Sequence, residues 1–229
     1  MSLEIKAVIF DVDGLLLDTE SLYLQVDQSL VNDYSKEPRK ITSRERKLYV
    51  GTTQQHSMKV IIEEFGLPLT IEEAIEIRAE RLQKVFPTCK EMPGARKLVE
   101  HLFKNKIPIA TATSSSRRDM ELKLQNHQWI YDSMGKNMVC GDDITNHKPN
   151  PEIFLLAASK LNIDPQYCLV FEDSINGIKA GINAGMNTIH VPSGEDQRDT
   201  SLKSSEMIDS IEDFVPEKYT LLPYEKNLN

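Results

Sequence analysis

Short apolar runs alternate with segments of helical periodicity over most of this 229-residue chain, and this alternation restricts the folds open to it. Runs typical of buried strands lie at residues 7–10, 107–112, 138–140, 168–171 and 188–191. Strands that alternate with helices form a parallel sheet covered by helices, with right-handed crossovers. We therefore expect an α/β protein with a Rossmann-like, doubly wound parallel sheet.

One interval, residues 19–88, interrupts this alternation. It contains no convincing strand, and helical patterns cover residues 22–34, 54–65 and 71–86. Prolines and glycines near its ends suit hinges. We expect a helical cap domain at 19–88, inserted into a core domain formed by residues 1–18 and 89–229.

Composition narrows the possible partners. The chain carries 27 Lys and Arg against 35 Asp and Glu, a net charge of −8, which disfavours binding to nucleic acid or to an anionic membrane. Its three cysteines are odd in number and widely spaced, so neither a disulfide framework nor a zinc site is indicated. No apolar run approaches about 18 residues, and no cleavable leader is evident. We expect a cytoplasmic monomer.

The first apolar run ends in two carboxylates with one residue between them, Asp11 and Asp13, and Gly14 follows at once. Like charges at the end of a buried strand are costly unless a cation or a proton compensates them. The pair therefore favours a metal site or acid/base chemistry. Asp11 could attack phosphorus, and Asp13 could donate and later accept a proton. An ordinary turn after a strand would show the same residues.

Hydroxyl and ammonium groups that suit a phosphoryl group occur at two later positions. Thr113 and Ser114 follow the run at 107–112, where hydroxyls and helix amides could donate to phosphate oxygens. Lys148 precedes a proline, and prolines restrict the backbone enough to aim the lysine at Asp11. Helix capping and a solvated surface lysine are the ordinary alternatives.

Another apolar run, at 168–171, also ends in acids, Glu172 and Asp173. Open parallel sheets bind ligands at the carboxyl ends of their strands. Mg²⁺ prefers oxygen ligands, so Asp11, the backbone carbonyl of Asp13 and Asp173 suit it. Glu172 would serve as a further ligand or as an acceptor for metal-bound water. The dipole of a following helix explains one such acid better than two.

These motifs, Asp11-x-Asp13-Gly14, Thr113, Lys148-Pro149 and Glu172-Asp173, stand in the order typical of the haloacid dehalogenase superfamily, which the chain resembles. An intact second aspartate is similar to the pattern of its phosphatases and phosphomutases. Stretches such as 107–115 and 169–173 resemble the GS1-like group, which includes pseudouridine-5′-phosphatase and phosphatases of small polyol phosphates. A basic stretch at 36–46 departs from that group.

The resemblance implies a Mg²⁺-dependent phosphatase that acts on a nucleoside or polyol phosphate through an aspartyl-phosphate. It implies Asp11 as nucleophile and Asp13 as acid and base. Phosphate would be held by Thr113, Ser114 and Lys148, and Mg²⁺ by Asp11, Asp13, Glu172 and Asp173. In similar enzymes a cap turn, here with Gly51 and Thr52, faces the site and contacts the leaving group. That turn could equally well only join two helices.

Three other functions share these residue types. A phosphomutase has the same core but retains the phosphate on an isomerised sugar. A receiver-like signalling module also combines aspartates, a hydroxyl and a lysine, but needs only about 120 residues and no inserted cap. A catalytically inactive binding protein is disfavoured because every catalytic position is filled.

Overall fold

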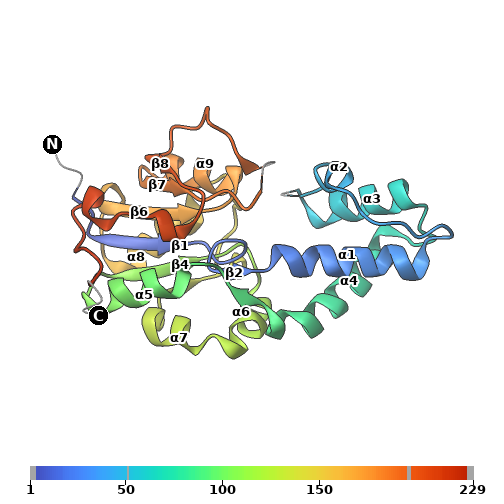
Figure 1. Cartoon of the computed structure of the whole chain (residues 1–229), viewed down its shortest axis with the longest axis horizontal. Helices are drawn as coiled ribbons and strands as arrows, with labels where there is room; N and C mark the ends of the chain where they lie inside the picture. Colours follow the sequence, from blue (N-terminus) through green and yellow to red (C-terminus); the bar gives the residue numbers. More distant parts are fainter. Residues whose placement is uncertain (1–3, 51, 195–196, 226–229) are drawn as a thin grey trace. The chain divides into compact units, whose positions relative to one another are not determined.

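The computed structural model describes residues 4–50, 52–194 and 197–225 (Figure 1). Its main sheet consists of parallel strands in the order β5-β4-β1-β6-β7-β8. These strands are β1 (Ala7–Phe10), β4 (Ile109–Ala112), β5 (Met138–Val139), β6 (Cys168–Glu172), β7 (Asn187–His190) and β8 (Glu206–Met207). A separate antiparallel pair joins β2 (Leu17–Asp18) to β3 (Lys90–Glu91). The predicted α/β fold is confirmed, and each predicted strand is present within two residues of its expected bounds.

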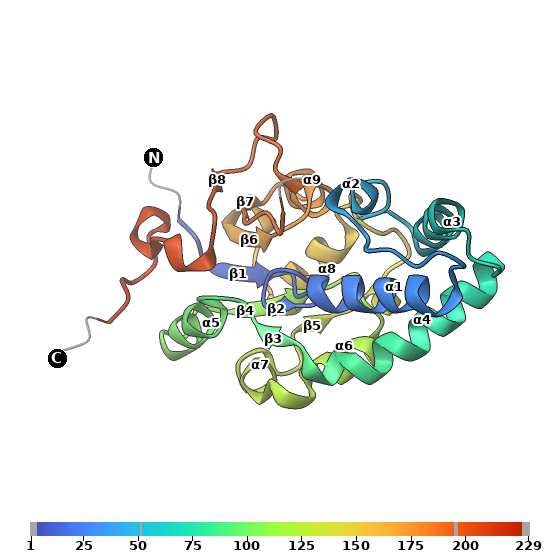
Figure 2. The ribbon, with the colours of Figure 1, turned by 45° about the vertical axis from the view of Figure 1, so that its right-hand side comes forward.

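Helices cover both faces of this sheet, which explains why its strands are apolar without alternation. Figure 2 shows α5 (Ala95–Lys104) and α7 (Gln128–Met134) on one side, and α8 (Glu152–Leu161) and α9 (Ile175–Asn183) on the other. Successive residues of β1 point to opposite faces. Ala7 and Ile9 belong to the core cluster that includes Phe154 of α8. On the other face, Phe10 stacks on Phe171 with ring centroids 5.2 Å apart.

The remaining helices in the described residues of the sheet-containing unit are short. They are α6 (Arg117–Lys123) and the 3₁₀ turns η2 (Leu124–Asn126), η3 (Gly141–Asp143), η4 (Pro165–Tyr167), η6 (Ile211–Asp213) and η7 (Pro216–Tyr219). The C-terminal turns contribute to the core, because Phe214 of the η6–η7 segment meets Phe171 edge-on at 4.8 Å. The segment that contains Phe214 thus helps to cover β6, the strand that ends in Glu172.

The chain divides into two compact units. The unit with the main sheet runs to Asp18 and resumes at Lys90, and the other comprises Thr19–Cys89. The latter contains α1 (Glu20–Tyr34), α2 (Ser43–Arg46), α3 (Gln54–Phe65), α4 (Ile71–Val85) and the turn η1 (Phe86–Thr88). Leu30, Met58 and Ile61 lie in its own apolar core. Cys89, which we expected in the core domain, groups with the helical unit, and the role of this unit as a cap stays a prediction.

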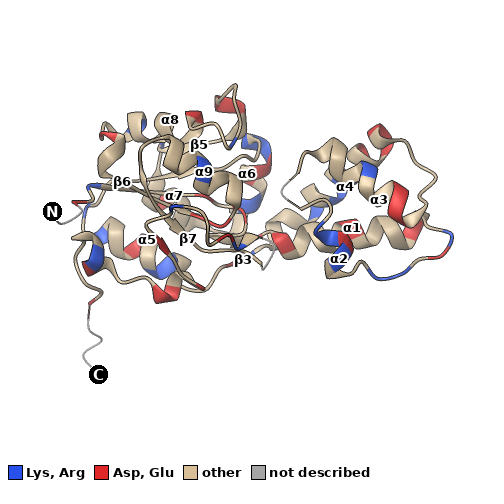
Figure 3. Ribbon diagram, turned by 90° about the horizontal axis from the view of Figure 1, so that it is seen from above, with Lys and Arg blue, Asp and Glu red and all other residues tan. Residues whose placement is uncertain are grey.

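The basic stretch at 36–46 occupies the loop after α1 and helix α2, where Figure 3 shows Lys and Arg positions close together along the chain. Part of this charge is paired within the helical unit. Arg39 contacts Glu45 at 2.5 Å, and Arg46 contacts Glu20 at 2.7 Å. These pairs help to fix the loop and α2 to α1.

Within the described ranges, no helix combines the length and the apolar character needed to span a bilayer. The three cysteines, Cys89, Cys140 and Cys168, are free and buried. The cytoplasmic location and the monomeric state stay predictions.

Candidate active site

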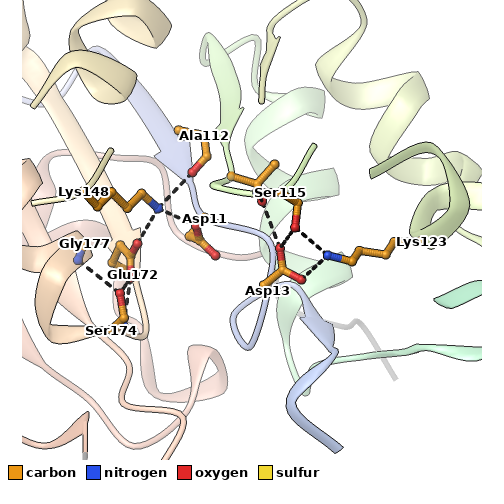
Figure 4. Close-up of polar contacts among 10 residues, drawn as sticks. Asp11, Asp13, Ala112, Ser115, Lys123, Lys148, Glu172, Ser174 and Gly177 are labelled. Atoms are coloured by element: carbon orange, nitrogen blue, oxygen red, sulfur yellow. Dashed lines mark hydrogen bonds and ion pairs between the residues drawn. The ribbon is translucent and has the colours of Figure 1, made fainter. Parts of the chain in front are cut away.

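The candidate acids of the sequence lie where three neighbouring strands, β4, β1 and β6, end. β1 stands between β4 and β6 in the sheet, and all three run in the same direction. Asp11 follows β1, Thr113 follows β4, and Glu172 is the last residue of β6. Residues separated by more than 100 positions are therefore brought to one edge of the sheet, as Figure 4 shows for part of this set.

Lys148 links all three of these strand ends (Figure 4). Its Nζ atom donates to Asp11 Oδ1 at 2.5 Å, to Glu172 Oε1 at 2.6 Å and to the carbonyl of Ala112 at 3.1 Å. The side chain is only 7% exposed, so Lys148 is not a solvated surface lysine. Burial disfavours its charge, but the carboxylates of Asp11 and Glu172 outweigh this and raise the pKa of Lys148.

Asp11, Glu172 and Asp173 form a cluster of carboxylates that could hold a metal ion. One oxygen of each lies within 4.8 Å of the others, and all three residues are buried. Burial and the nearby carboxylates of Glu172 and Asp13 outweigh the attraction of Lys148 and raise the pKa of Asp11 to about 7. A hard divalent cation with oxygen ligands would compensate the negative charge of these carboxylates. The residues present therefore fit Mg²⁺.

Two glycines give this cluster its space. A Cβ atom on Gly14 would lie 2.5 Å from Asp173 Oδ2, and one on Gly177 would lie 1.8 Å from Glu172 Oε1. Glu172 is further oriented by Ser174, whose amide and hydroxyl donate to Oε2 at 2.8 and 2.9 Å. Oε1 accepts from Lys148, so both oxygens of Glu172 are held in place by hydrogen bonds.

Asp13 has a separate set of partners. Lys123 donates to its Oδ1 atom at 2.5 Å, while the hydroxyls of Thr113 and Ser115 donate to Oδ2, each at 2.9 Å. Figure 4 shows the carboxylate turned toward Ser115 and Lys123, on the side away from Lys148. Burial disfavours its charge, but the charge and hydrogen bonds of Lys123 outweigh this and lower the pKa of Asp13. The contacts of Asp13 in this arrangement therefore favour its ionised form.

Ser115 and Lys123 were not predicted from the sequence. Ser115 is hidden in a run of hydroxyl residues, of which only Thr113 and Ser114 were candidates. Lys123 stands beside Met120 and Leu124 on the buried side of α6 and the turn that follows it. A lysine at an apolar position of a helical pattern is the one local signal that could have identified it.

Three of the other predicted residues have less definite positions. Thr113 directs its hydroxyl at Asp13, so that proton does not reach a phosphate in this arrangement, and Ser114 is exposed. In the helical unit, the Thr52 hydroxyl donates to the Tyr49 carbonyl at 2.6 Å and so stabilises its own turn. Gly51 lies outside the described residues. The phosphate-binding and specificity roles of these residues stay predictions.

The comparison with protein-family models gives a match over residues 8–191, to haloacid dehalogenase-like hydrolases. The chain belongs to this family. The matched segment contains every residue of the strand-end site, so family and geometry point to the same residues.

Two similar proteins agree with the assignment to this family. The chain is 36% identical to the (DL)-glycerol-3-phosphatase 2 of Arabidopsis thaliana, covering 96% of this chain and 93% of the relative. It is 34% identical to a Drosophila melanogaster protein named probable pseudouridine-5′-phosphatase, covering 93% of each. As a haloacid dehalogenase-like hydrolase with phosphatases as relatives, the chain is an enzyme of the phosphomonoesterase type, as expected.

Among solved structures, a crystal structure from Thermotoga maritima described as a candidate β-phosphoglucomutase matches with a TM-score of 0.75 and 28% identity. The match covers 91% of this chain and 96% of that one. Membership of the hydrolase family leaves the receiver-like alternative without support, whereas this structural relative keeps the phosphomutase alternative relevant.

Proposed function

We propose that this hydrolase is a Mg²⁺-dependent phosphatase that cleaves a small nucleoside or polyol phosphate through a phosphorylated Asp11. Two relatives support this substrate class, because one is named a glycerol-3-phosphatase and the other a probable pseudouridine-5′-phosphatase. The buried acids around Asp11 support the metal.

The proposed reaction has two displacements at phosphorus. A carboxylate oxygen of Asp11 attacks the phosphorus, the bond to the ester oxygen breaks, and Asp13 gives that oxygen a proton as the alcohol leaves. Water then attacks the phosphorus of the aspartyl-phosphate, gives a proton to Asp13, and releases inorganic phosphate and the Asp11 carboxylate. Asp13 must carry a proton in the first displacement, so one of its two oxygens has to exchange its present hydrogen bonds for a contact with the ester oxygen.

Lys148 has an electrostatic role in this scheme. Its ammonium group is held between Asp11 and Glu172. There it can offset part of the negative charge around the nucleophile and attract an anionic phosphoryl group. Asp11, Asp173 and the Asp13 carbonyl would hold Mg²⁺, with Glu172 beside them. The metal, when bound, offsets the charge that develops on the phosphoryl oxygens.

The observation that carries the proposal is the buried contact of Lys148 with both Asp11 and Glu172 at the edge of the sheet. The test is phosphate release from glycerol 3-phosphate and pseudouridine 5′-phosphate, with and without Mg²⁺, by the wild-type protein and by Asp11→Asn. We expect Mg²⁺-dependent release by the wild type, and a loss of at least roughly 10³-fold in Asp11→Asn with unchanged folding. Normal turnover by Asp11→Asn would refute the mechanism.

The phosphomutase remains a second candidate because of the structural relative from Thermotoga maritima. The two activities differ in the fate of the phosphate. Incubation with a sugar 1-phosphate separates them, since a phosphatase releases inorganic phosphate whereas a phosphomutase returns the 6-phosphate of the same sugar.

A further inference from the structure

Lys123 is a fully buried lysine in a position that the proposed mechanism does not use. Its exposed fraction is 0%, and its Nζ atom contacts Asp13 Oδ1 at 2.5 Å and Ser115 Oγ at 2.6 Å. Lysine is rarely buried unless its charge is paired. Here the partner is the residue that we propose as acid and base.

Weak structural effects do not account for this burial. Lys123 ends α6, and a cation at the C-terminus of a helix gains only a small stabilisation from the helix dipole. Removing an ammonium group from water costs much more free energy than the dipole returns, even when the group is paired. A neutral side chain at this apolar position would avoid that cost, so the charge points to a task at Asp13.

The hydrogen bonds around Asp13 define its orientation. Lys123 holds one oxygen, while the hydroxyls of Ser115 and Thr113 hold the other. The Ser115 hydroxyl accepts from Lys123 and so directs its own proton at Asp13. The Thr113 hydroxyl is fixed in turn, because it accepts from the amide of Ser115 at 3.0 Å. Lys123 therefore contacts Asp13 both directly and through Ser115.

We propose that Lys123 is a positioning residue that orients the Asp13 carboxyl group for its two proton transfers, an inference that rests on the proposed function. Lys123 lies 110 residues from Asp13 in the sequence, and its contacts with Asp13 and Ser115 both lead to the same carboxylate. Its effect on the reaction therefore passes through Asp13.

The leaving group distinguishes this role from a merely structural one. An alkyl phosphate such as glycerol 3-phosphate needs a proton on its leaving oxygen, whereas p-nitrophenyl phosphate has a leaving group that departs without one. Lys123→Met keeps the length and apolar stem of the side chain but removes the charge. We expect Lys123→Met to lower kcat for glycerol 3-phosphate by roughly 10²-fold with little change in KM, and to affect p-nitrophenyl phosphate much less.

A double-mutant cycle with Asp13→Asn completes the test. If Lys123 acts through Asp13, Lys123→Met has no further effect on kcat in the Asp13→Asn protein. That double variant also has no unpaired charge at this position, so it remains testable if the single variant folds poorly. Lys136→Met, at an exposed lysine of the same unit, serves as the matched control and should behave as the wild type.

Equal losses of kcat for the two substrates, or losses that multiply in the double variant, would overturn the positioning role. If Asp13→Asn itself shows no preference between the two leaving groups, the acid/base role of Asp13 fails instead. The two failures are therefore distinguishable.

Discussion

At the residue scale, glycine at two positions determines whether the acids can lie where they do. Gly14 has a φ of +76°, and its missing side chain leaves room for Asp173. A Cβ atom on Gly177 would overlap the carboxylate of Glu172. The sequence indicates why a glycine suits position 14, since the chain turns sharply there after a strand. The contact with Asp173, 159 residues away, depends on the fold.

Gly14→Ala can be compared with Gly185→Ala to separate backbone strain from crowding of the acids. Gly185 has a similar φ of +72°, but a Cβ atom there would meet nothing within 4 Å, so both substitutions carry the same strain, about 1–2 kcal/mol. Only Gly14→Ala should also weaken Mg²⁺ binding, by at least roughly tenfold, because Asp173 must move. Thermal unfolding and Mg²⁺ titration of activity measure the two effects. Equal Mg²⁺ affinity in the two variants would contradict the expectation.

At the element scale, helix patterns predicted the helical unit well, because its helices have their own local signals. α4 begins at a capping box formed by Thr70 and Glu73. It ends one residue earlier than predicted, because Phe86 opens a 3₁₀ turn that contains Pro87. The sequence did not reveal the pairing of helices, in which Arg78 of α4 donates to both oxygens of Asp27 in α1 at 2.6 and 3.3 Å.

Breaking this buried ion pair should strongly destabilise the helical unit. Asp27 is 2% exposed and Arg78 is 11% exposed, so Arg78→Met leaves an uncompensated buried carboxylate and should lower the free energy of unfolding by about 3–5 kcal/mol. Arg81→Met in the same helix is the control. Its carboxylate partner, Asp33, is 56% exposed, and the loss of that ion pair should cost at most about 1 kcal/mol. Denaturant unfolding of both variants measures the difference, and equal losses would refute it.

At the scale of the whole molecule, the sheet concentrates negative charge at one edge, and the protonation of that edge should be linked to stability. Asp11 has a pKa of about 7 without metal, above the 3.8 of an unperturbed carboxyl. Between these values the folded protein retains a proton that the unfolded chain has released. The stabilisation from this proton is therefore complete below about pH 4 and is lost as the pH rises through about 7.

Mg²⁺ should reverse this loss, because it binds the ionised carboxylates of the folded state. We expect the metal to raise the melting temperature more at about pH 8, where it does not compete with the proton on Asp11, than at about pH 6. Thermal unfolding with Mg²⁺ and with a chelator measures the effect. Asp11→Asn lacks the titrating group, so its melting temperature without metal should depend less on pH over this range. An equal increase at both values would contradict the linkage.

The sequence predicted the strands and most helices because buried strands and amphipathic helices leave regular patterns of apolar residues. The short strands β2, β3 and β8, with two residues each, were not predicted, since no periodicity can develop over that length. Acids at the ends of apolar runs were recognisable for a similar reason: they interrupt a pattern. Helix α2, with four residues and none of them buried, left no apolar pattern to detect.

The sequence by itself determined the fold class, the family resemblance, and the presence of Asp11, Asp13, Lys148, Glu172 and Asp173 as candidates. Only the tertiary structure decided which of them meet. Lys148 bridges Asp11 and Glu172, whereas Asp13 turns to Lys123, a residue without a motif. The physical reason is that a side chain's partner is set by which strands neighbour each other and by the space left at glycines, and neither is encoded in local spacing.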